Sequence, residues 1–130
     1  MAIAFEISAL IPASPETIYK AWLDSEGHSQ MTGSEARMSS ELGGEFDAWD
    51  GYIIGRNLEL EYGKHIVQSW KTVEFDDGEP FSFIDITLTP EDNGTRIRLT
   101  HMNLPAHGSQ YEQGWIDNYF EPMREYFGSL

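Results

Sequence analysis

Four histidines are the residues of this sequence best suited to acid-base or metal chemistry: His28, His65, His101 and His107. None of them lies in H-E-x-x-H or in another short metal-binding spacing, so we expect no metal site and no cofactor. His101 shares a strand face with Ile97 and Leu99 and is expected near the mouth of a cavity. It is either a hydrogen-bonded core histidine or a group that binds a ligand or acts as a general base.

Nucleophilic and nucleotide-binding motifs are absent from the sequence. It contains no G-x-S-x-G elbow, no P-loop and no dinucleotide fingerprint. We therefore predict no catalytic residue, and enzymatic activity is the weaker expectation.

One amide and four aromatic side chains are the candidates for binding a ligand. Gln68 lies between Ile66 and Trp70 on one strand face, and a buried amide requires partners from a ligand, water or neighbouring side chains. Aromatic side chains suit either a pocket wall or an ordinary core. With His101, the predicted ligand-binding set is Phe46, Gln68, Trp70, His101, Trp115 and Tyr119.

Composition restricts the class of protein and its partners. The 130 residues, 40% of them hydrophobic, predict one globular domain over residues 1–130. Eight basic against 22 acidic residues give a net charge of −14, which disfavours nucleic acid and anionic membranes as partners. The absence of cysteine, of a basic leader and of any apolar run of about 18 residues leads us to expect a cytoplasmic protein.

Alternating apolar residues predict a series of strands joined by short turns. They cover 3–11, 53–62, 65–72, 82–89 and 95–102, and Phe46 and Ala48 indicate another strand after Gly43-Gly44. Leu58 and Leu60 are expected to point inward. Asp50-Gly51 and Asn93-Gly94 are turn signals, because these residues tolerate positive φ. Strands joined by such turns pair antiparallel.

Helix signals lie on both sides of the strand region. Ser14 before Pro15 predicts a helix start, and Asp24 a second start whose short helix ends near Gly33. Ser109 and Glu112 have the spacing of a capping box.

An aromatic stripe with a spacing of four residues predicts a long C-terminal helix. Its members are Tyr111, Trp115, Tyr119 and Met123, and Pro122 is expected to kink the helix. A twisted sheet with one apolar face needs a cover, and this helix is the element long enough to supply it. The sequence thus predicts an α+β fold with a curved antiparallel sheet of about six or seven strands, wrapped on the C-terminal helix, and two short helices after the first strand.

Three segments in this order resemble the START-like helix-grip superfamily. They are IPASPETIYKAWLDSEGHSQMTG at 11–33, GGEFDAWDGYIIGRNLELEYGKHIVQSWKT at 43–72 and EQGWIDNYFEPMREYF at 112–127. More closely, they resemble the branch named after the activator of the heat-shock protein 90 ATPase. In the eukaryotic co-chaperone of that branch, such a domain is joined to a second, N-terminal domain, which these 130 residues do not include.

The resemblance implies a cavity between the sheet and the long helix. Superfamily members use it for lipids, sterols, polyketides and other apolar molecules, so we expect binding of a small hydrophobic or amphipathic ligand. A protein-interaction module with a chaperone as partner is the alternative that the branch implies. A cavity enzyme, a cyclase or hydrolase using His101, is a further alternative, because a fold alone does not determine function.

Overall fold

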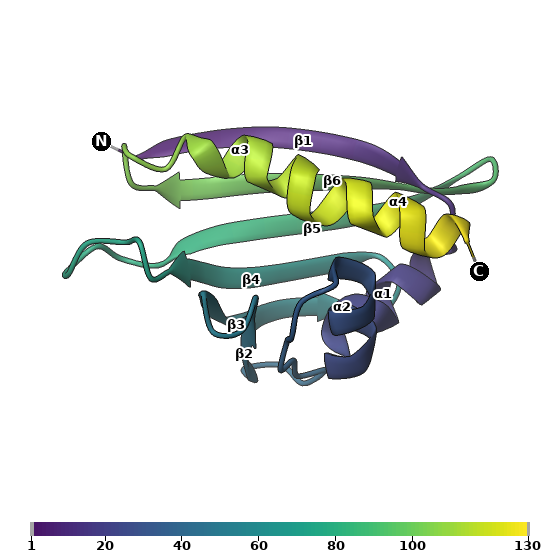
Figure 1. Ribbon diagram of the computed structural model, residues 1–130, viewed down its shortest axis with the longest axis horizontal. Helices are drawn as coiled ribbons and strands as arrows, with labels where there is room; N and C mark the ends of the chain where they lie inside the picture. The colour runs from purple at the N-terminus through teal and green to yellow at the C-terminus, as the bar shows by residue number, and fades with distance from the viewer. Residues whose placement is uncertain (1, 130) are drawn as a thin grey trace.

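The computed structural model describes residues 2–129, which fold into one antiparallel sheet and a set of helices (Figure 1). The sheet has six strands in the order β1-β6-β5-β4-β3-β2. The strands are β1 Ile3–Ile11, β2 Glu45–Ala48, β3 Ile53–Glu61, β4 His65–Thr72, β5 Ser82–Glu91 and β6 Gly94–Leu104. The helices are α1 Pro15–Leu23, α2 Ser25–Thr32, α3 Gln110–Trp115, the π-helical turn η1 Ile116–Phe120 and α4 Glu121–Gly128.

The C-terminal segment α3-η1-α4 lies across one face of the sheet, and α1 and α2 cover that face at the end where α4 lies (Figure 1). This arrangement confirms the predicted helix-grip fold. It places a single apolar core between the sheet and the helices. None of the helices between residues 2 and 129 has the length and apolar character that crossing a membrane requires.

The predicted strand faces are confirmed for β4, β5 and β6. Side chains of alternate residues point to opposite faces of a sheet, so one face of each strand enters the core. The buried rows are Ile66, Gln68 and Trp70 in β4, Ile84, Ile86 and Leu88 in β5, and Ile97, Leu99 and His101 in β6.

The predicted inward orientation of Leu58 in β3 is wrong. Asn57 pairs with Gln68 and Glu59 with Val67, so Leu58 is the extra residue of a β-bulge. A bulge shifts the alternation of the strand by one residue. Asn57 therefore takes the buried place, and Leu58 is 39% exposed.

The caps of the first two helices are confirmed, and the cap of the third is wrong. The Ser14 hydroxyl accepts the Thr17 N–H at 3.2 Å, and the Asp24 carboxylate accepts the Gly27 N–H at 2.8 Å. Gly33, with φ of 82°, ends α2 as predicted. Ser109 makes no capping hydrogen bond, because its own backbone is helical, with φ −63° and ψ −23°.

The irregularity expected at Pro122 takes the form of a π-helical turn. Pro122 has no N–H to donate to the preceding turn of the helix. The backbone N–H of Glu121 bonds to the carbonyl of Ile116, five residues earlier. The wider turn carries one additional residue, and both Tyr119 and Phe120 are buried.

Candidate ligand pocket

A pocket of about 450 Å³ lies between the C-terminal helical segment, β4 and the turn that joins β2 to β3. The lining residues that are not aromatic are Ile53, Gln110, Gly114 and Asn118. The six aromatic side chains of its wall are Trp49, Tyr52, Trp70, Tyr111, Trp115 and Tyr119.

The aromatic rings of this wall are in contact with one another. Trp115 lies 5.6 Å from Trp70 and 4.7 Å from Tyr119, measured between ring centroids. Trp49 meets Tyr119 edge-on at 6.4 Å, and Tyr111 meets Trp70 at 4.9 Å. These distances lie within the range of favourable aromatic pairs, so these five rings form a continuous aromatic surface.

The β2–β3 turn holds Trp49 at the edge of the pocket by an uncommon backbone conformation. Trp49, Asp50 and Gly51 have successive φ values of 54°, 55° and 86°. The predicted Asp50-Gly51 turn is confirmed, but the left-handed stretch begins one residue earlier. Left-handed backbone at a tryptophan is costly and is typically found at functional sites.

A hydrogen-bonded layer centred on His101 lies beneath the wall. Ser82 donates its hydroxyl proton to the Trp70 carbonyl at 2.6 Å, so it accepts from His101 Nε2 at 2.9 Å. Trp115 Nε1 donates to His101 Nδ1 at 3.0 Å. The imidazole is therefore neutral with its proton on Nε2, and burial lowers the pKa of His101 to about 3.

Gln68 completes a second buried chain of hydrogen bonds. Its Oε1 accepts from Trp22 Nε1 at 3.1 Å, and its Nε2 donates to Asn57 Oδ1 at 2.9 Å. Asn57 Nδ2 in turn donates to the carbonyls of Ser39 and Glu41, at 2.8 and 2.9 Å. These hydrogen bonds connect α1, β4 and β3 to the loop before β2.

A second buried histidine supports the pocket wall from behind. His28 Nδ1 lies 2.8 Å from the Trp22 carbonyl, and Nε2 lies 2.8 Å from the Tyr119 hydroxyl. A carbonyl only accepts, so Nδ1 carries the proton and Nε2 accepts from Tyr119. Burial lowers the pKa of His28 to about 4 and raises that of Tyr119. His28 thereby fixes the orientation of one aromatic wall residue.

Tyr52 and Tyr111 form a polar corner of the pocket. The Tyr52 hydroxyl donates to Glu74 Oε1 at 2.5 Å, and the Tyr111 hydroxyl lies 2.6 Å from Thr72 Oγ1. The Glu74 N–H also donates to Thr72 Oγ1, at 3.1 Å. Burial, reinforced by the hydrogen bond to Glu74, raises the pKa of Tyr52, so this phenol stays protonated.

The six predicted site residues fall into three places. Trp70, Trp115 and Tyr119 line the pocket. Gln68 and His101 lie beneath the wall, fully buried and hydrogen-bonded, and His101 is not at the cavity mouth as expected.

Phe46 is the predicted residue that lies outside this group. A Cβ at Gly55 would come within 2.6 Å of the Phe46 ring, so the ring packs directly on that glycine. It borders a separate, more polar hollow that Arg37 and Arg56 also line. The role of all six residues in ligand binding stays a prediction.

The sequence interpretation missed Trp49, Tyr52 and Tyr111 as wall residues. Tyr111 could have been found, because it belongs to the same four-residue stripe as Trp115 and Tyr119. Trp49 and Tyr52 flank the predicted Asp50-Gly51 turn. One aromatic residue on each side of a turn could have indicated that this turn contributes to the pocket wall. No signal in the sequence indicates that His28 pairs with Tyr119, which lies 91 residues away.

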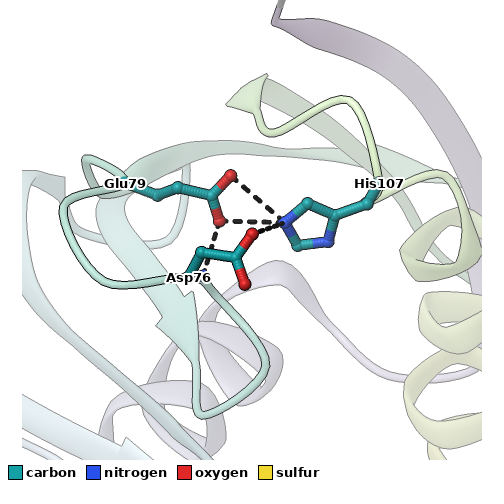
Figure 2. Close-up of side chains that lie close together, drawn as sticks. All are labelled: Asp76, Glu79 and His107. Atoms are coloured by element: carbon teal, nitrogen blue, oxygen red, sulfur yellow. Dashed lines mark hydrogen bonds and ion pairs between the residues drawn. The ribbon is translucent and has the colours of Figure 1, made fainter.

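His107 lies in a separate cluster with Asp76 and Glu79 (Figure 2). Its Nε2 is 2.9 Å from Glu79 Oε1 and 3.8 Å from Asp76 Oδ2. The hydrogen bond to Glu79 raises the pKa of His107 and lowers that of Glu79. These contacts join the β4–β5 loop to the connection before α3.

The family described as activator of Hsp90 ATPase homolog 1-like protein matches residues 12–128. The chain belongs to this family. The match confirms the resemblance inferred from the three sequence segments. Human activator of 90 kDa heat shock protein ATPase homolog 1 is 29% identical over 116 residues, which are 88% of this chain and 34% of the human protein. The chain spans about a third of the length of the curated relatives it matches.

Solved structures place this member of the Hsp90 ATPase activator-like family among START-like folds. An HSP90 activator from Plasmodium falciparum superposes with a TM-score of 0.86 and 25% identity, covering 97% of this chain and 96% of that one. A protein from Mesorhizobium loti has a TM-score of 0.80 at 18% identity, covering 98% of each chain, which shows the fold alone.

Proposed function

We propose that this chain binds a small apolar or amphipathic molecule in the pocket between the C-terminal helical segment and the β2–β3 turn. The observation that carries the proposal is the pocket of about 450 Å³ walled by six aromatic side chains. Ligand sites typically measure about 300–1,000 Å³ and combine apolar walls with a few polar groups. Here Gln110, Asn118 and the hydroxyl of Tyr52 supply the polar groups at the edge.

The complete hydrogen bonding of the layer beneath the aromatic wall supports a binding role for the pocket. Within residues 2–129, every buried side-chain nitrogen and oxygen has a hydrogen-bond partner. The layer beneath the wall is therefore complete without a ligand. His101 has no free ring nitrogen for acid-base chemistry, so binding is better supported than catalysis by this residue.

Titration with the neutral fluorescent probe N-phenyl-1-naphthylamine tests the proposal. We expect saturable binding, with a tenfold or greater loss of affinity in Trp49→Leu and no change in Phe83→Leu, since Phe83 lies on the opposite face of the sheet. Native mass spectrometry of protein from its own source identifies any molecule that copurifies. Absence of both probe binding and a copurifying molecule contradicts the proposal.

Regulation of the Hsp90 ATPase is a second candidate function. It is favoured by the 29% identity to the human activator over 88% of this chain and by the match to 96% of the solved chain of the Plasmodium falciparum activator. The test adds this chain to purified Hsp90 from the same source and measures ATP turnover and complex formation at low salt. Stimulated turnover is the expected result, and absence of both binding and stimulation contradicts this function.

A further inference from the structure

The pocket wall combines aromatic side chains with an absence of charge. Among the described residues 2–129, neither a lysine nor an arginine nor a carboxylate lines the pocket. Three of the wall residues are tryptophans, the side chain with the strongest attraction for cations. An anionic ligand would therefore enter a pocket that offers it no counter-charge.

The surroundings of the pocket favour positive charge. The Glu74 carboxylate accepts a hydrogen bond from the Tyr52 hydroxyl, so a negative group lies at the hydroxyl end of one wall ring. The chain as a whole carries a net charge of −14, which attracts cations and repels anions over its surface.

Elsewhere in this chain, exposed aromatic rings already have cations of their own. Lys71 Nζ lies 4.9 Å from the centre of the Phe81 ring, and Lys20 Nζ lies 5.9 Å from that of Tyr62. The wall rings have no such partner among the residues the structure describes. The half-buried rings of Trp49 and Tyr52 at the pocket edge thus have electron-rich surface available to a cation brought by a ligand.

We infer that the pocket takes an organic cation, a quaternary or alkylated ammonium group attached to an apolar body. The inference rests on the proposed ligand-binding function and specifies its chemical class. The ammonium group would lie against the tryptophan and tyrosine rings, and the apolar body would replace water along the remaining wall. A quaternary ammonium suits such a wall best, because it has no N–H group whose hydrogen bonds to water would be lost on entry.

Three probes that share a similar shape but differ in charge test whether the charge of the ligand decides binding. Benzyltrimethylammonium is the cation, neopentylbenzene replaces its nitrogen by carbon, and benzylsulfonate is the anion. Binding is measured by quenching of tryptophan fluorescence in 0.5 M NaCl, which screens the surface charge. We expect the cation to bind about 5- to 30-fold more tightly than the neutral probe, the ratio that a cation–π contribution of about 1–2 kcal/mol gives. The anion should bind most weakly.

Two substitutions locate the effect. Trp49→Leu keeps an apolar group at the pocket edge but removes a ring, so it should lower the cation-to-neutral ratio by about fivefold. Phe83→Leu, on the opposite face of the sheet, should leave the ratio unchanged. Equal or tighter binding of neopentylbenzene overturns the cation inference and leaves the apolar pocket standing. Failure of all three probes overturns the proposed function as well.

Discussion

Two layers on the inner side of the sheet differ in what their side chains do: the lower one stabilises the fold, and the upper one forms the pocket wall. The lower layer holds His28, Gln68 and His101, each at most 2% exposed and hydrogen-bonded through its side chain. The upper layer, the pocket wall, includes the half-buried Trp49 and Tyr52. A buried polar group with all its partners present serves the fold. Trp49 and Tyr52 leave part of their rings open to a ligand, so exposure distinguishes these two edge residues from the lower layer.

The largest expected effect comes from the pH dependence of the lower layer. The pKa values of His28 and His101 are about 4 and about 3 in the folded chain, against 6.5 for the unfolded residue. The unfolded chain therefore binds more protons between these values, and stability falls as pH falls below 6.5. Well below pH 6.5 the slope approaches about 1.4 kcal/mol per pH unit for each histidine, which amounts to roughly 4 kcal/mol for both between pH 7 and pH 5.

Urea unfolding at pH 7, 6 and 5 measures this dependence. A His101→Leu variant provides the control, because its slope against pH should be about half that of the original chain. Equal unfolding free energies at pH 7 and pH 5 would contradict the expected loss, since His107, with its raised pKa, is the one histidine whose shift opposes it.

Removing His101 itself is expected to have the next largest effect. His101→Leu fills most of the volume but leaves the Trp115 Nε1–H without an acceptor in a buried layer. The loss of unfolding free energy at pH 7 should be about 3 kcal/mol. The matched control is His65→Leu, whose partly exposed contact with Asp85 should cost less than about 1 kcal/mol. Similar losses in both variants would contradict the distinction between layers.

Gln68→Leu tests the other half of the lower layer. The substitution removes the acceptor of Trp22 Nε1 and the donor to Asn57. We expect a loss of about 2 kcal/mol in urea unfolding at pH 7. Binding of the neutral fluorescent probe should be unchanged at temperatures where the variant is folded. A large loss of probe binding without a loss of stability would place Gln68 in the binding site instead.

Tyr52→Phe should have the smallest effect on stability. It removes one hydroxyl at the pocket edge, and its partner Glu74 is already exposed to water, so the cost should be below about 1 kcal/mol. Thermal unfolding measures it against the original chain. A loss as large as that of His101→Leu would assign Tyr52 to the structural layer.

The regular parts of the fold could be predicted because they repeat. Strict alternation identified the buried faces of β4, β5 and β6, and local cap residues identified the start of α1. The bulge at Leu58 could not be predicted, because it depends on pairing with the neighbouring strand. The pocket could be predicted only in part, because Trp49 reaches it through a left-handed turn that no local pattern specifies.

The two buried imidazoles carry their protons on opposite nitrogens, Nδ1 in His28 and Nε2 in His101. Nitrogen-15 chemical shifts of the two tautomers differ widely, so each ring has its own spectral signature. The acceptor nitrogen of His28 shares a proton with Tyr119, whose ring lines the pocket. The acceptor nitrogen of His101 likewise bonds to Trp115, another wall residue. The two imidazole signals therefore report on two different points of the pocket wall.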